Sequence, residues 1–81
     1  MYRIRLENLD ELREGKTVLY LSRLTKYARP YLNSIFTGKI LIEEETAKKI
    51  LLPILTESRK LNEKLEKYGI EAMIQYFFDK I

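Results

Sequence analysis

The sequence predicts an all-α domain of five to six helices. Its 81 residues supply enough apolar side chains for one hydrophobic core. Along most of the chain these side chains recur every three or four positions, which is the period of a helix. Gly and Pro stand between the apolar stretches, where helices usually begin or end. We therefore expect a single domain over residues 1–81, with a core over about residues 6–55 and a C-terminal helical extension over about residues 56–81.

The first helix is expected near residues 6–14. Its apolar stripe consists of Leu6, Leu9 and Leu12. Gly15 follows as the C-cap, because glycine readily adopts the left-handed conformation that ends many helices. The alternation of polar and apolar side chains over residues 2–6 also allows a short strand or arm at the start of the chain.

Two short helices joined by a tight turn are expected next. Thr17 is a suitable N-cap for the second helix, which runs to about Leu24. Residues 26–28 form the turn. The third helix has Pro30 in its first turn, where the missing N–H has no helical partner in any case, and Gly38 ends it.

The fourth helix is expected to begin with a glutamate-rich first turn. Pro53 either bends this helix or begins a fifth one after an end near Leu51. Helical spacing then continues to Gly69. Seven positions keep the 4-3 rhythm of a coiled-coil seam, namely Ala47, Leu51, Ile54, Ser58, Leu61, Leu65 and Tyr68. This seam indicates packing within the domain or across a dimer.

The last helix is expected over about residues 70–80 and carries a complete apolar stripe. The stripe consists of Ile70, Met73, Ile74, Phe77, Phe78 and Ile81. One interpretation is that it covers the core of the domain itself. The other is a homodimer interface, because terminal segments fray unless they are docked. The candidate interface residues are Ile70, Met73, Ile74, Phe77 and Phe78.

The chain contains no Cys and no His, which excludes thiolate and imidazole chemistry, disulfides and ordinary zinc sites. We predict that the protein is not an enzyme and uses no cofactor and no metal. Residues 43–45 are three glutamates, but acids in a first helical turn usually complement the helix dipole. No uncharged apolar run is long enough for a bilayer, and the N-terminus does not resemble a signal peptide. We therefore expect a cytoplasmic protein without a membrane partner.

Charge is unevenly distributed along the chain. Residues 15–42 hold five basic and no acidic side chains, whereas residues 1–14 and residues 43–81 each carry a net charge of −1. A long stretch without carboxylates suits a surface that approaches phosphates, because each acid would repel a polyanion. The alternative is a chance gap in a small basic protein.

The spacing of residues after Thr17 is that of a helix-turn-helix motif. The positions that match are apolar Leu21, small Ser22, Thr25, Tyr27, Leu32, Ile35 and Gly38. Together they resemble the Cro and phage-repressor (XRE-type) family of helix-turn-helix regulators, over about residues 6–55. Residues 45–50 look like the fourth helix of that family.

This resemblance implies a sequence-specific transcriptional regulator that binds double-stranded operator DNA as a homodimer, with its third helix in the major groove. Such a regulator is expected to be a repressor of a phage or mobile element. The positions implied to contact bases are Arg29, Tyr31, Asn33 and Ser34. Those implied to contact phosphates are Lys16, Thr17, Lys26, Thr37 and Lys39.

The second helix is unusually apolar for such a motif. Its apolar and aromatic residues are Val18, Leu19, Tyr20, Leu21 and Leu24. A surface of this kind also suits a protein partner. The alternative function is therefore a protein-binding helix-turn-helix module, such as an antirepressor or an inhibitor of a host defence complex.

Overall fold

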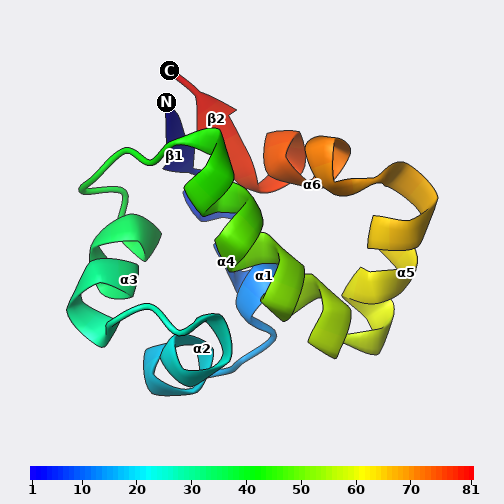
Figure 1. Cartoon of the computed structure of the whole chain (residues 1–81), viewed down its shortest axis with the longest axis horizontal. Coiled ribbons are helices and arrows are strands. Elements are labelled where there is room, and N and C mark those ends of the chain that lie inside the picture. Colours follow the sequence, from blue (N-terminus) through cyan, green and yellow to red (C-terminus); the bar gives the residue numbers. More distant parts are fainter.

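Six α-helices and a small antiparallel sheet make up the fold in the computed structural model, which describes residues 1–81 (Figure 1). In chain order the elements are β1 (Tyr2–Ile4), the 3-10 helix η1 (Leu6–Asn8), α1 (Leu9–Arg13), α2 (Val18–Thr25), α3 (Arg29–Phe36), α4 (Glu44–Glu57), α5 (Arg59–Tyr68), α6 (Ile70–Phe77) and β2 (Phe78–Lys80). The chain is predominantly helical, as the sequence predicts, but the sheet is an addition to the all-α expectation. None of the helices combines the length and the apolar character that crossing a bilayer requires.

The expected first helix is divided into η1 and the short helix α1. Its end lies one residue earlier than predicted, because Glu14 is the C-cap and its N–H donates to the carbonyl of Asp10 at 3.0 Å. Glu14 and Gly15 both adopt the left-handed conformation, with φ of +50° and +75°. Glycine adopts this conformation without strain, whereas glutamate does so at a cost of about 1–2 kcal/mol. The paired left-handed residues turn the chain from α1 toward α2.

Helices α2 and α3 begin and end close to the predicted positions. Thr17 caps α2, because its Oγ1 accepts a hydrogen bond from the N–H of Tyr20 at 3.1 Å. Lys26, with φ of +67°, ends α2 and begins the turn. Helix α3 carries Pro30 in its first turn and is followed by Gly38 at φ of +77°. The local signals for starting and stopping a helix therefore operate here as expected.

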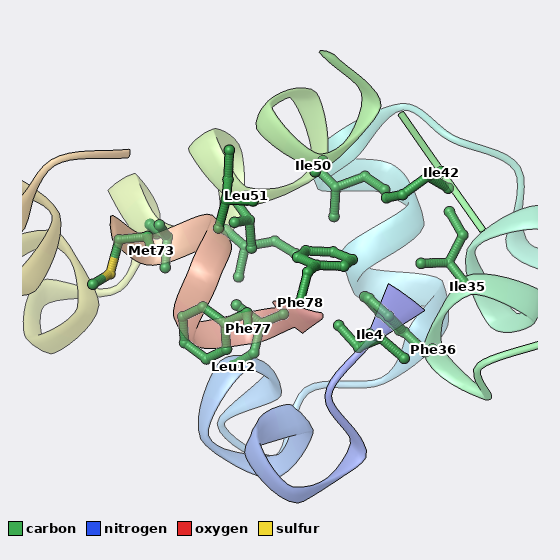
Figure 2. Close-up of a cluster of buried hydrophobic side chains, with 14 of the residues drawn as sticks. Ile4, Leu12, Ile35, Phe36, Ile42, Ile50, Leu51, Met73, Phe77 and Phe78 are labelled. Atoms are coloured by element: carbon green, nitrogen blue, oxygen red, sulfur yellow. The ribbon is translucent and has the colours of Figure 1, made fainter. Parts of the chain in front are cut away.

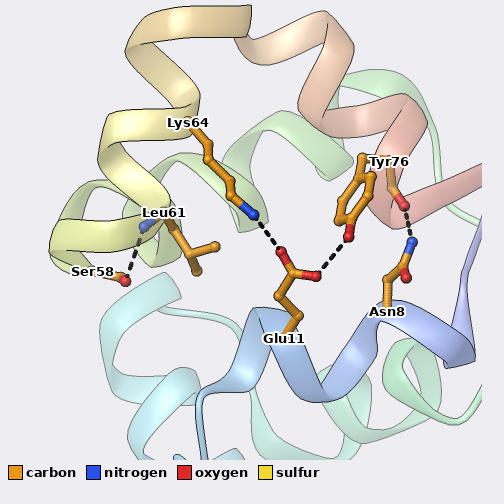
Figure 3. Close-up of polar contacts among 6 residues, drawn as sticks. All are labelled: Asn8, Glu11, Ser58, Leu61, Lys64 and Tyr76. Atoms are coloured by element: carbon orange, nitrogen blue, oxygen red, sulfur yellow. Dashed lines mark hydrogen bonds and ion pairs between the residues drawn. The ribbon is translucent and has the colours of Figure 1, made fainter.

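Pro53 does not divide α4, but Ser58 does separate α4 from α5. The alternative of a helix end near Leu51 is wrong, because α4 continues through Pro53 and buries Ile54 and Leu55. The continuous helix expected through Ser58 is also wrong. Ser58 adopts an extended conformation and its hydroxyl accepts the N–H of Leu61 at 3.2 Å (Figure 3). A serine that satisfies a free helix N–H in this way favours a new helix start over continuation.

The end of the chain forms a strand where a helix was expected. Helix α6 ends at Phe77, and residues 78–80 pair with residues 2–4 in an antiparallel sheet. Ile4 lies opposite Phe78, and both side chains are buried. The helix prediction is therefore wrong for the last three positions, whereas the strand alternative at the N-terminus is confirmed for Tyr2–Ile4. Helical periodicity is a local signal and does not detect a partner at the other end of the chain.

Seventeen buried apolar side chains form one continuous core, which runs from Ile4 to Phe78. Figure 2 shows side chains from α1, α4, α6 and both strands meeting around Phe78. Helix α3 contributes Ile35 and Phe36 to the same cluster. The C-terminal extension therefore supplies part of the core that also supports α2 and α3.

This core corrects the predicted dimer interface. Four of the five candidate residues are no more than 5% exposed within the single chain, namely Met73, Ile74, Phe77 and Phe78. Ile70 is half-buried against the same cluster. Side chains that already fill the core of one chain leave no surface for a second copy. The terminal stripe covers the domain's own core, which is the first of the two interpretations.

The predicted 4-3 seam also packs within the chain. Its first five members are buried, Leu65 is half-buried, and Tyr68 is 56% exposed. Because the chain breaks at Ser58, the seam lies on two helices that pack against each other instead of on one long helix.

A polar cluster fastens α1 to α5 and α6 (Figure 3). The carboxylate of Glu11 accepts hydrogen bonds from the hydroxyl of Tyr76 at 2.6 Å and from Nζ of Lys64 at 2.9 Å. These bonds lower the pKa of Glu11 below its ordinary value, and the bond from Tyr76 has the larger effect. The same bond raises the pKa of the Tyr76 hydroxyl. Asn8 adds a bond from Nδ2 to the carbonyl of Tyr76 at 2.7 Å.

Candidate nucleic-acid interface

The buried residues of α3 decide which of its side chains are available to a ligand. Leu32, Ile35 and Phe36 are no more than 2% exposed and hold the helix against the core. The helix period then places the residues between them toward solvent. Arg29, Pro30, Tyr31 and Asn33 are exposed and Ser34 is half-buried. An eight-residue helix thus presents one complete polar face.

Arg29 and Asn33 lie one helical turn apart on the same side of this face. Together with Pro30 and Val18, they line a shallow surface hollow between the start of α2 and the start of α3. Neither the Arg29 guanidinium nor the Asn33 amide forms a hydrogen bond or an ion pair within the chain. Their donor groups are therefore free to meet an external acceptor. Of the four predicted base contacts, these two are brought together by the structure.

Tyr31 and Ser34 lie on the other side of the α3 face. The ring of Tyr31 packs against that of Tyr27, with 5.5 Å between the ring centroids and a tilt of 39°. The carbonyl of Ser34 accepts the backbone N–H of Lys39 at 3.0 Å. At 100° per residue, Tyr31 points about 160° away from Asn33 around the helix. The structure therefore does not group Tyr31 with Arg29 and Asn33.

The predicted phosphate-binding lysines differ in whether their ammonium groups already contact other side chains of the chain. Lys26 and Lys39 are exposed and have no carboxylate within ion-pair distance. Lys16 is partly engaged, because its Nζ lies 3.7 Å from the carboxylate of Glu14 and 5.6 Å from the centroid of the Tyr20 ring. A free ammonium group meets a phosphate without first losing a partner. Lys26 and Lys39 are accordingly the better placed of the three.

The two predicted threonine contacts are not equivalent. Thr17 uses a lone pair of its hydroxyl to cap α2, so the hydroxyl proton remains available for donation. Thr37 instead donates its proton to the carbonyl of Asn33 at 2.9 Å. Since a phosphate oxygen only accepts hydrogen bonds, Thr37 would have to break this bond to contact one. The geometry therefore favours Thr17 over Thr37.

The charge asymmetry seen in the sequence persists in three dimensions. Of the five cations in residues 15–42, only Lys16 forms an ion pair. Arg23 on α2 is also exposed and without a partner. Val18 belongs to the hollow beside Arg29 although nothing in its apolar character marks it as a functional residue. Only the packing of α2 on α3 reveals its position.

The three consecutive glutamates do not form a metal site. Glu44 accepts a hydrogen bond from the hydroxyl of Tyr2 at 3.4 Å and lies 3.9 Å from Nζ of Lys48. No group of three or more acidic side chains in the chain is arranged to hold a metal ion. These acids lie at the start of α4, where their negative charges interact favourably with the positive end of the helix dipole.

Comparisons of this chain with protein-family models, with curated proteins and with solved structures found no match.

Proposed function

We propose that the protein is a Cro-like transcriptional regulator that recognises operator DNA with α3 in the major groove and α2 across the backbone. One observation carries the proposal. Arg29 and Asn33 lie one turn apart on the exposed face of α3 with unused donors, and the unpaired cations Lys26 and Lys39 lie in the chain segments before and after this helix. A polar, base-reading pair flanked by phosphate-binding charges is the arrangement that groove recognition requires.

Each group has a defined role in this proposal. The guanidinium of Arg29 donates two parallel hydrogen bonds to O6 and N7 of guanine, and the amide of Asn33 pairs with N6 and N7 of adenine. Pro30, which lines the same hollow, offers an apolar surface to a thymine methyl group. Lys26, Lys39 and Thr17 hold phosphates and so fix the register of α3.

The protein acts as a homodimer in this proposal. One eight-residue helix reads only a few base pairs, and pairing two copies on half-sites one turn apart multiplies the affinity. The resemblance to Cro and phage repressors supports repression as the output.

The test begins with selection of a preferred site from random duplexes, followed by titration of the wild type and two variants. We expect Arg29→Ala to lose about 1–3 kcal/mol of discrimination between preferred and random duplex. We expect Lys39→Ala to weaken binding to both duplexes and to reduce the salt slope by about one. Absence of duplex binding by the wild type at about 50 mM salt would overturn the proposal.

A second candidate function rests on the exposed apolar surface of α2. Leu19 and Tyr20 are 40% and 41% exposed, and they adjoin the unpaired Arg23 in the helix. Exposed aliphatic and aromatic side chains beside an arginine are typical of protein-binding surfaces. The double variant Leu19→Ser, Tyr20→Ser distinguishes the two functions. A wild type that binds no duplex but binds a protein partner, with that partner lost in the double variant, supports the second candidate. Duplex binding that the double variant retains supports the first, because neither side chain is among its DNA contacts.

A further inference from the structure

We propose that Arg3, on strand β1, binds a DNA phosphate together with Lys39, so that these two cations clamp the backbone beside the C-terminal end of α3. This inference rests on the proposed DNA-binding function and extends its contact surface. Arg3 belongs to the first part of the sequence, residues 1–14, whose net charge is −1. Only the folded chain brings it to the basic surface.

Backbone hydrogen bonds hold β1 against the segment that follows α3. The N–H of Tyr2 donates to the carbonyl of Ile42 at 2.7 Å, and the N–H of Ile42 donates to the carbonyl of Tyr2 at 2.9 Å. Figure 1 shows this segment returning from the end of α3 to β1. Strand β1 is thereby held on both of its edges, by the segment after α3 on one edge and by β2 on the other.

The side chain of Arg3 lies directly beside Gly38. A Cβ atom placed on Gly38 would lie 3.9 Å from Cδ of Arg3. Apart from atoms of the adjoining residues, no other heavy atom would lie within 4 Å of it. The residue after Gly38 is Lys39, so the side chain of Arg3 lies against the backbone position just before this lysine.

Arg3 is a free cation. It is exposed and forms no hydrogen bond and no ion pair within the chain. The residue opposite it in the sheet, Asp79, is the carboxylate nearest in register, but its Oδ1 lies 3.0 Å from Nε of Arg5. Arg5 thus engages the one acid that the sheet places across from Arg3.

Two cations on adjoining backbone segments, neither with a counter-ion in the chain, favour the approach of an anion, because each positive charge raises the local potential. Phosphate suits this pair in particular. The planar guanidinium of Arg3 donates two parallel hydrogen bonds to phosphate oxygens, and the Lys39 ammonium adds a compact charge. Backbone phosphates next to a groove-bound α3 are the phosphates within reach of these side chains.

The experiment compares the salt dependence of duplex binding for wild type, Arg3→Gln, Arg3→Lys and Arg59→Gln. Arg3→Gln removes the charge but keeps most of the stem that packs beside Gly38. Arg59→Gln is the matched control, because Arg59 is exposed, forms no ion pair and lies on α5 at the opposite end of the long axis (Figure 1). Thermal unfolding of each variant is recorded beside the titrations.

We expect Arg3→Gln to reduce the slope of log affinity against log salt by about 0.9, on preferred and random duplex alike. Arg3→Lys should keep the slope, and Arg59→Gln should leave it unchanged. All four proteins should unfold at similar temperatures, because none of these changes alters the core.

The outcomes separate this inference from the proposed function. Duplex binding by the wild type with an unchanged slope in Arg3→Gln overturns the clamp and leaves the proposed function standing. An equal slope change in Arg59→Gln also overturns it, because net charge alone would then explain the effect. A wild type that binds no duplex overturns both.

Discussion

The segment of residues 15–42 and the C-terminal segment of residues 43–81 share one core but have contrasting surfaces. In the first segment, four of five cations have no carboxylate partner. In the second, seven basic and eight acidic side chains are interspersed, and Lys48 and Lys64 both contact carboxylates. The core is common to both, so the difference in surface charge is what favours the first segment over the C-terminal one as the binding surface in the proposed function.

The comparison also shows what the C-terminal segment does for the first. Its buried residues complete the cluster that holds α3 in place, and its polar contacts fasten α1 to α5 and α6. In the proposed function, the first segment therefore binds the ligand and the C-terminal segment supports it.

The largest effect is expected from truncation after Gly69. This change removes two phenylalanines that are each 1% exposed, and it removes strand β2. The free energy lost with several buried side chains exceeds the roughly 5–15 kcal/mol by which a typical domain is stable against unfolding. The truncated chain should show no cooperative thermal unfolding by far-UV circular dichroism, whereas deletion of the exposed Ile81 alone should preserve it. A cooperative transition in the truncated chain would mean that residues 1–69 fold without α6 and β2.

A smaller loss of stability is expected when a buried side chain of α3 is truncated. Leu32 is 0% exposed, and Leu32→Ala should cost about 2–5 kcal/mol through lost burial and the cavity left behind. Asn33→Ala, at the next position, should cost less than about 0.5 kcal/mol, because its side chain is exposed and unbonded. Urea denaturation measures both. Similar losses in the two variants would contradict the division of α3 into a buried and a binding face.

Removing the cap at the junction of α4 and α5 should have a moderate effect. Ser58→Ala leaves the N–H of Leu61 without its partner and should cost about 1 kcal/mol. Ser58→Asp, which retains a capping oxygen, should recover most of this loss in the same denaturation experiment. If Ser58→Ala were as stable as wild type, continuous helix through this position would be the better description.

The smallest effect is expected from the cluster around Glu11. Its pKa is lowered in the folded chain, so its contribution is present above the ordinary glutamate pKa of about 4.3 and is lost as the pH falls through the lowered value. Glu11→Gln should cost about 0.5 kcal/mol at neutral pH, since the side chains are partly exposed. The difference from wild type should shrink in acid. Glu63→Gln, which removes an exposed and unpaired carboxylate, should show no such convergence.

Local signals predicted α2 and α3 well. Thr17, Pro30 and Gly38 act on the backbone within one turn of their own position, so their effects are visible in the sequence. The pairing of Arg29 with Asn33 follows from their spacing on a helix for the same reason. The resemblance groups Tyr31 with them, but the contact between Tyr31 and Tyr27 depends on how the turn before α3 folds back.

The sequence could not predict what depends on distant partners. The strand at residues 78–80 exists because residues 2–4 lie beside it, and Arg3 reaches Gly38 for the same reason. Ser58 was assigned to an apolar seam by its position in the repeat, although its hydroxyl provides a cap. A short polar side chain at a seam position is the signal that would have identified this break.

The pairing of the first and last strands has a consequence for the order of events during synthesis. Strand β1 emerges from the ribosome first but finds its partner only when residues 78–80 have been made. Until then, the hydrophobic side chain of Ile4 has no Phe78 to pack against. Contacts between residues this far apart in sequence form slowly. The segment that carries Arg3 therefore waits for β2 to complete its sheet, and it stays accessible to proteases and chaperones until that pairing forms.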